Sequence, residues 1–119
     1  MPRCPSEKQP VSEETPDVIC SYSGMQFISI SRRLTERFSD EQFAPHIGAE
    51  RERVRELYRD GVVRSIWSRK DAPGAIMLLE CTDEAAARAA VASLPLAQRE
   101  MLEVQIFPLG PYPAFCPNV

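Results

Sequence analysis

The apolar residues of this chain fall into six segments, and the order of these segments restricts the fold more than any other feature. Four short segments have the length and apolar content of strands: 25–31, 62–68, 75–81 and 102–109. Two longer segments repeat apolar or small residues at helical spacing: 40–60 and 82–93. The order strand, helix, strand, strand, helix, strand predicts an α+β domain of the ferredoxin-like βαββαβ type, with both helices on one face of a sheet.

The first predicted helix carries an acidic residue within its apolar stripe. Five apolar side chains recur along one side of segment 40–60: Phe43, Ile47, Val54, Leu57 and Tyr58. Glu50 has the same helical phase as Ile47 and Val54, so its carboxylate is expected to face whatever the helix packs against. Burial disfavours the charged form of a carboxyl group and raises its pKa toward neutrality, as a general base requires. The alternative is a structural carboxylate that forms a salt bridge or caps a neighbouring backbone.

Capping residues predict where the two helices begin. Ser39 or Asp40 can cap the first helix, but Pro45 is tolerated only in a first turn, which moves the predicted start of regular helix toward Ala44. Thr82 is the predicted cap of the second helix.

Strand alternation predicts which side chains share a face of the sheet. In segment 62–68, period two places Val63, Ser65 and Trp67 on one face and Val62, Arg64 and Ile66 on the other. Segments 25–31 and 75–81 are apolar on both faces, although helices cover only one face of such a sheet. We therefore expect a homodimer or a larger homo-oligomer in which a second copy covers the other face.

The remaining segments and the composition set further limits. Residues 1–24, rich in Pro, Ser and Glu, are predicted to be a flexible leader, 25–110 the domain and 111–119 a Pro-rich tail. The net charge of −3 gives no general attraction to nucleic acid or to acidic membranes. Four widely spaced cysteines, with no C-x-x-C pair, and a single histidine lack the ligand spacing of a structural zinc site, so no metal is expected. Without a secretory or membrane-spanning segment, the expected location is the cytoplasm.

Several residues other than Glu50 are candidates for a site. His46 lies one turn before Glu50, within reach of it as a second catalytic group or as a partly exposed histidine at the helix start. Arg64 can hold a substrate carboxylate or pair with an acidic residue across the sheet. Trp67 and Tyr58 are pocket-wall or packing residues.

The chain resembles muconolactone isomerase and, more broadly, the dimeric α+β barrel proteins. The resemblance rests on residues between 50 and 104: Glu50-Arg51-Glu52, Leu57, Arg59, Gly61, Arg64, Trp67, Leu94-Pro95-Leu96 and Glu103-Val104. Family members carry a histidine where this chain has Ser65, and Phe-Pro-Tyr-Met where it has residues 97–100. The resemblance implies an enzyme without cofactor or metal that moves a proton and a double bond along a lactone ring.

The expected function is a cofactor-independent isomerase or cyclase acting on a small unsaturated lactone or related carbonyl compound. Glu50 and His46 are its predicted catalytic residues, and Arg64, Trp67, Tyr58 and Ser65 its predicted substrate contacts. One alternative is a non-catalytic oligomeric ligand-binding module, and another is a cofactor-independent monooxygenase of the same barrel type. An open, mostly apolar pocket beside Glu50 favours the enzyme, whereas a filled space and a salt-bridged Glu50 favour the module.

Overall fold

One antiparallel sheet of four strands forms the body of the protein, whose computed structural model describes residues 25–115. The strands are β1 (Met25–Arg33), β2 (Val63–Ser68), β3 (Ala75–Cys81) and β4 (Leu102–Leu109). Three helices join them: α2 (Asp40–Arg59), α3 (Glu84–Ala92) and the short α4 (Pro95–Gln98). The strand order β2-β3-β1-β4 is that of a ferredoxin-like domain, so the predicted α+β class and topology are confirmed.

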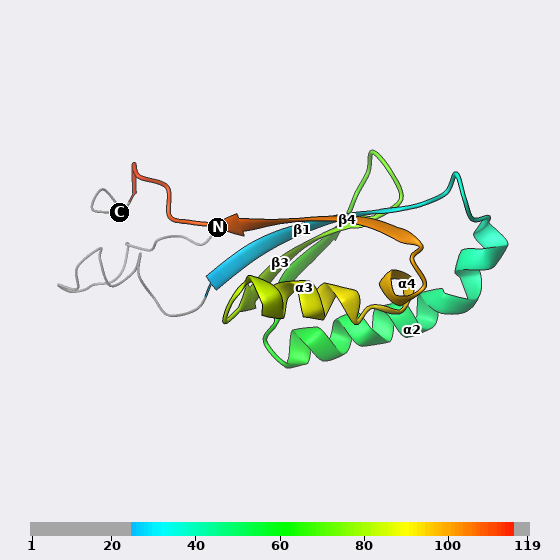
Figure 1. Ribbon diagram of the computed structural model, residues 1–119, viewed down its shortest axis with the longest axis horizontal. Coiled ribbons are helices and arrows are strands. Elements are labelled where there is room, and N and C mark those ends of the chain that lie inside the picture. The colour runs from blue at the N-terminus through cyan, green and yellow to red at the C-terminus, as the bar shows by residue number, and fades with distance from the viewer. Residues whose placement is uncertain (1–24, 116–119) are drawn as a thin grey trace.

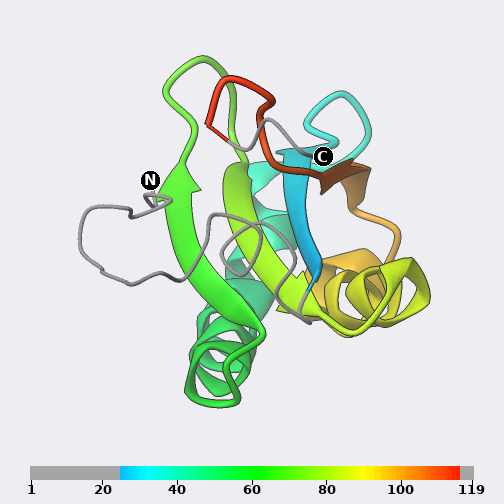
Figure 2. The same ribbon diagram turned by 90° about the vertical axis from the view of Figure 1, so that its left-hand side faces the viewer.

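The helices lie on one face of the sheet, where the core forms (Figures 1 and 2). Phe27 of β1 and Leu79 of β3 are fully buried at its centre and pack with Leu57 of α2 and Val91 of α3. A second, smaller cluster joins the first turns of α2 to α4 and to the start of β4 through Phe43, Leu96 and Met101. The space between these two clusters is where a pocket forms.

The first helix begins earlier than predicted. Ser39 is its N-cap: its hydroxyl accepts a hydrogen bond from the backbone N–H of Gln42, and the Gln42 side chain accepts one from the N–H of Ser39 at 2.7 Å. This capping box begins the helix at Asp40 although Pro45 lies inside it, so the predicted start near Ala44 is wrong. Proline removes one helical hydrogen bond, and α2 changes direction near this end (Figure 1).

The cap of the second helix, in contrast, lies one residue later than predicted. Asp83, rather than Thr82, has the extended backbone of an N-cap, and its carboxylate accepts a hydrogen bond from the N–H of Ala86 at 2.8 Å. After α3, the chain turns at Leu94 into α4, a helix that was not predicted because four residues carry no recognisable periodicity.

The side chains of β2 do not alternate as predicted, because the strand contains a register shift between Val63 and Ser65. Val63 lies opposite Leu79 and Ile66 opposite Met77, so Val63 and Ile66 share the helix-facing side of the sheet. Such a bulge places one extra residue in a strand and reverses the alternation beyond it. The predicted grouping of Val63 with Ser65 and Trp67 is therefore wrong.

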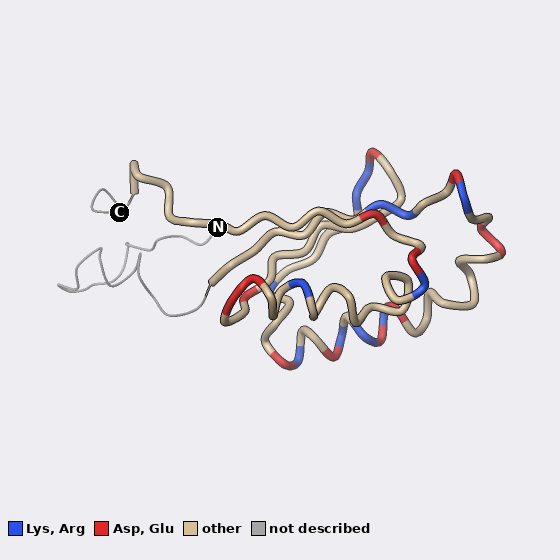
Figure 3. Tube along the Cα trace, in the orientation of Figure 1, with Lys and Arg blue, Asp and Glu red and all other residues tan. Residues whose placement is uncertain are grey.

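The sheet face opposite the helices is apolar along its centre. Cross-strand pairs place six side chains there, which we call the open face: Ile28, Ile30, Trp67, Ile76, Leu78 and Phe107. Trp67 and Phe107 are 52% and 45% exposed. Charged residues lie mainly on the helices, in the loops and near the strand ends, and the middle of the sheet carries few (Figure 3).

The predictions for the leader, 1–24, and for residues 116–119 lie outside the described residues. The described part of the tail, 111–115, is exposed, with the rings of Tyr112 and Phe115 6.1 Å apart. Within 25–115, no helix has the length and apolar character needed to cross a membrane.

Candidate active site

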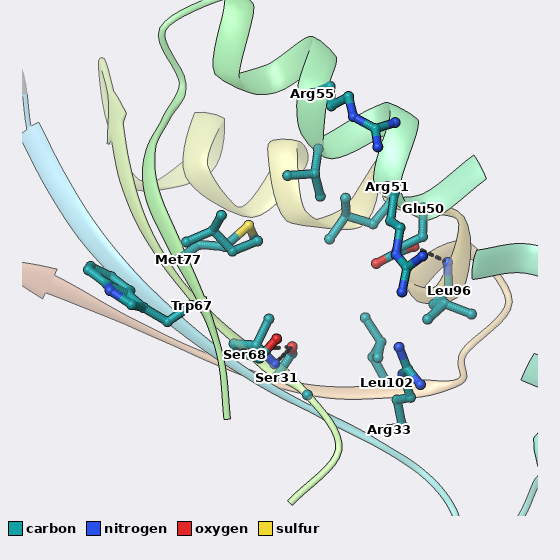
Figure 4. Close-up of a pocket in the computed structure, with 15 residues that line it drawn as sticks. Ser31, Arg33, Glu50, Arg51, Arg55, Trp67, Ser68, Met77, Leu96 and Leu102 are labelled. Carbon is teal, nitrogen blue, oxygen red and sulfur yellow. Dashed lines mark hydrogen bonds between the residues drawn. The ribbon is translucent and has the colours of Figure 1, made fainter. Parts of the chain in front are cut away.

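A pocket of about 400 Å³ lies between α2, the helix-facing side of the sheet and the start of α4. Its volume falls within the range of roughly 300–1,000 Å³ that small-molecule sites occupy. Helix α2 contributes Glu50, Arg51, Val54 and Arg55. In Figure 4, Glu50 and Leu96 lie on one side of this space and Met77 on the other. The carboxylate thus borders an open volume with apolar walls.

Glu50 is held in place by the backbone of α4. Its Oε1 accepts a hydrogen bond from the N–H of Leu96 at 2.9 Å, drawn as a dashed line in Figure 4. Proline at position 95 starts α4 at this point, so the N–H of Leu96 has no helical partner and is free to donate outward. The other oxygen, Oε2, accepts no hydrogen bond from residues 25–115 and is not fully buried, which leaves it open to a ligand.

Burial changes the acidity of Glu50. Partial removal from water raises the pKa of this carboxyl group above its ordinary value, and this is the largest influence on it. The hydrogen bond from Leu96 and the positive charge of Arg33 act in the opposite direction and are smaller. A carboxylate with a raised pKa and an accessible oxygen is suited to accept a proton from carbon acids and to return it.

Two guanidinium groups border the pocket without a carboxylate partner among residues 25–115: Arg33 of β1 and Arg51 of α2. Arg33 lies with its Cζ 5.7 Å from the centroid of the Phe43 ring, a cation–π contact that orients it. Arg55 differs from them, because it forms an ion pair with Glu52 at 3.1 Å. The end of the pocket near Glu50 therefore holds positive charge that can bind an anion.

The floor of the pocket comes from β1 and β3. The Ser31 hydroxyl lies 3.2 Å from both the N–H and the carbonyl oxygen of Ala75, donating to the oxygen and accepting from the N–H. Gly74 lines the pocket beside it, and a Cβ at this position would overlap the carbonyl oxygen of Ser31. Only glycine allows the β2–β3 loop to approach β1 this closely.

Of the residues predicted for the site, Glu50 borders the pocket as expected. His46 lies one turn earlier on α2, half-buried, and does not line the pocket. Arg64 is exposed and lies outside the pocket. Its Nε is 3.8 Å from Oε1 of Glu80, so it pairs with an acidic residue across the sheet, which was the alternative to substrate binding.

Three further residues that were predicted to contact the substrate, two on β2 and one on α2, do not face Glu50 across the pocket. Trp67 borders the pocket, but it pairs with Ile76 and its ring points away from Glu50 (Figure 4). Ser65 pairs with Leu78 on the same open side of the sheet. Tyr58 is 64% exposed and lies outside this pocket, along a second hollow farther down α2.

Sequence reasoning missed the pocket arginines. Arg33 follows Phe27, Ser29 and Ser31 at period two, so a strand extended by two residues beyond its predicted end would have placed it on the helix-facing side. Arg51 lies outside the apolar stripe of the helix, so helical phase did not indicate it, and it is exposed at the rim of the pocket. The hydrogen bond from the N–H of Leu96 to Glu50 could not be predicted, because a backbone group is the same whatever the side chain.

Comparison with known protein families identifies a match. The family model for muconolactone delta-isomerase matches residues 25–114, which includes every element of the fold and every residue that lines the pocket. No curated protein matches the chain. The match begins at Met25, where β1 begins.

Proposed function

Because the chain belongs to the muconolactone delta-isomerase family, we propose that it is a cofactor-independent isomerase that shifts a double bond in a small unsaturated lactone bearing a carboxylate. The observation that carries this proposal is the position of Glu50, which presents an accessible carboxylate oxygen to a pocket bordered by Arg33 and Arg51. A base and an anion-binding group on one small pocket are the parts that proton transfer beside a carbonyl requires.

In the proposed reaction, Oε2 of Glu50 removes a proton from the ring carbon that is joined to the lactone carbonyl through the carbon–carbon double bond. The electron pair of the broken C–H bond delocalises through the double bond onto the carbonyl oxygen and forms a dienolate, whose negative charge is stabilised by the nearby guanidinium of Arg33. Glu50 then returns the proton to the carbon next to the carbonyl, which restores the carbonyl and leaves the double bond one position farther from it. The hydrogen bond from Leu96 keeps the carboxylate oriented throughout, since Oε1 is occupied and Oε2 is available.

The test uses muconolactone in deuterated water. We expect the protein to incorporate deuterium at the reacting carbons, and Glu50→Gln to slow this by roughly 100-fold or more because the amide keeps the shape but cannot accept the proton. Glu41→Gln, on the exposed first turn of α2, is the matched control and should retain the rate. Equal rates for the Glu50→Gln variant and the parent protein would rule out Glu50 as the base.

A ligand-binding module without catalysis is the second candidate, and the hydrogen bond between Glu50 and Leu96 favours it, because this bond gives the carboxylate a structural role. In that case the parent protein binds a lactone carboxylate but exchanges no protons. Binding by calorimetry together with no deuterium incorporation would select this candidate.

A further inference from the structure

A second hollow continues the pocket along α2. It has a volume of about 360 Å³ and shares Val54, Arg55 and Ile66 with the pocket beside Glu50. Its outer walls are Tyr58, Arg59 and Val63. Since three residues line both, the two hollows are parts of one groove between α2 and β2.

The length of this groove follows from the helix. Glu50, Val54 and Tyr58 are spaced four residues apart, so they lie one above another along one side of α2. At 1.5 Å per residue, the groove runs for about 12 Å from Glu50 to Tyr58. A ligand that fills both ends is longer than a bare lactone ring.

The two ends differ in whether their guanidinium groups are paired with a carboxylate. Near Glu50, Arg33 and Arg51 have no carboxylate partner among residues 25–115. At the outer end, Arg55 and Arg59 are both paired with Glu52, at 3.1 and 3.3 Å. Both guanidinium groups at the outer end are thus already engaged by one carboxylate, and Tyr58, Val63 and Ile66 give this end apolar walls.

The outer end also leaves apolar surface in contact with water. Tyr58 is 64% and Ile66 42% exposed, while Val63 beneath them is buried. Covering such side chains with an apolar group is favourable, because it removes apolar surface of both partners from water.

Building on the proposed function, we propose that the groove binds an amphipathic carboxylate: the anionic head lies at Arg33 and Arg51, and an apolar substituent extends past Ile66 to Tyr58. The substrate is therefore an alkyl- or aryl-substituted lactone carboxylate. The outer end discriminates against a charged tail, because its apolar walls would remove water from the charge while its two guanidinium groups are already engaged by Glu52.

The test measures binding of straight-chain carboxylates to the full chain by calorimetry. Butanoate, hexanoate and octanoate share one head and differ only in tail length. We expect Kd to fall by roughly 3-fold for each added methylene, so that octanoate, with about four more methylenes, binds roughly 80-fold more tightly than butanoate. A flat series would overturn the inference.

Two variants locate the tail. Tyr58→Gln removes the outer wall and should weaken octanoate binding by roughly 3-fold or more, whereas Tyr112→Gln, an equally exposed tyrosine in the tail segment, should leave it unchanged. Octanoate binding that is tight but insensitive to Tyr58→Gln would place the tail elsewhere and overturn the inference. Absence of proton exchange with muconolactone would instead count against the proposed function alone, since this series measures binding without turnover.

Discussion

Glu50 bonds to the backbone of α4 and also borders the pocket, and its surroundings act in opposite directions on the ionisation of its carboxyl group. The N–H of Leu96 and the guanidinium of Arg33 favour the ionised carboxylate. Partial burial favours the neutral acid, and it is the stronger influence, so the pKa is raised. The folded state therefore loses stability when Glu50 ionises, and it keeps an acid that can exchange its proton.

This balance predicts how stability depends on pH. Between the ordinary pKa and the raised pKa of Glu50, the folded state binds more protons than the unfolded state, so the free energy of unfolding falls as pH rises through this window. Glu50→Gln has no such group and keeps the acceptor for Leu96. We expect its melting temperature to exceed that of the parent protein at neutral pH, with the difference shrinking toward about pH 4. A difference that stays constant with pH would contradict the raised pKa.

Two serines on the helix-facing side of β1 give a matched pair. Ser29 is 1% exposed and its hydroxyl has no hydrogen-bond partner among residues 25–115, whereas the Ser31 hydroxyl bonds both backbone groups of Ala75. Because an unpaired buried hydroxyl is unfavourable, Ser29→Ala should be neutral or should stabilise the protein by up to about 1 kcal/mol. Ser31→Ala should cost about 1–2 kcal/mol. Urea denaturation would measure both, and a larger loss for Ser29→Ala would disprove the assignment.

The sequence identified Glu50 through its helical phase, because a charged residue in an apolar stripe is visible without coordinates. It could not identify Arg33, whose place depends on how far β1 extends. The N–H of Leu96 was equally invisible, since it became available only through the turn from α3 into α4.

Among the elements, the limits of two strands were predicted correctly, whereas local irregularities were not. Strand β3 and strand β4 have the predicted limits, Ala75–Cys81 and Leu102–Leu109. The errors came from a capping box that begins α2 five residues before Pro45 and from the bulge in β2. Both features depend on local hydrogen bonds, which the spacing of apolar residues does not indicate.

Close approach between the β2–β3 loop and β1 gives a prediction at the scale of elements. Gly74→Ala would push a methyl group into the carbonyl oxygen of Ser31, so the loop or β1 must shift. We expect a loss of several kcal/mol, as for overpacked sites that cannot relax, or a chain that does not fold. Thermal melting monitored by circular dichroism is the measurement.

Gly48→Ala is the matched control for this change. Gly48 lies inside α2, and an added Cβ meets no atom within 4 Å. Alanine is favoured over glycine in a helix by roughly 1 kcal/mol, so this variant should be more stable than the parent protein. A Gly74→Ala variant as stable as Gly48→Ala would show that the loop does not need glycine.

The whole molecule has two sheet faces of different character. The helices bury one of them, and the open face defined above retains apolar side chains in contact with water. A stable monomer rarely leaves such a continuous apolar surface exposed. Self-association through this face remains our prediction, with the sheet of a second copy as the partner.

Sedimentation tests this association. We expect a species of at least twice 13.4 kDa, the mass of one chain. Trp67→Asp should weaken the association by roughly 100-fold or more, since it buries an unpaired charge. Tyr58→Asp, an exposed aromatic on the helix side, should have no such effect. A monomeric parent protein at high concentration would contradict the prediction.

The bulge in β2 has a consequence for how such a protein can change over time. Ile66 and Trp67 are successive strand residues and therefore point to opposite faces of the sheet. The register after the bulge directs Ile66 toward the groove and Trp67 toward the open face. Removing a single residue near Val63 would exchange them, so that ligand preference and self-association would be altered in one event. Substitutions at 66 and 67, by contrast, let each property vary independently while the other is preserved.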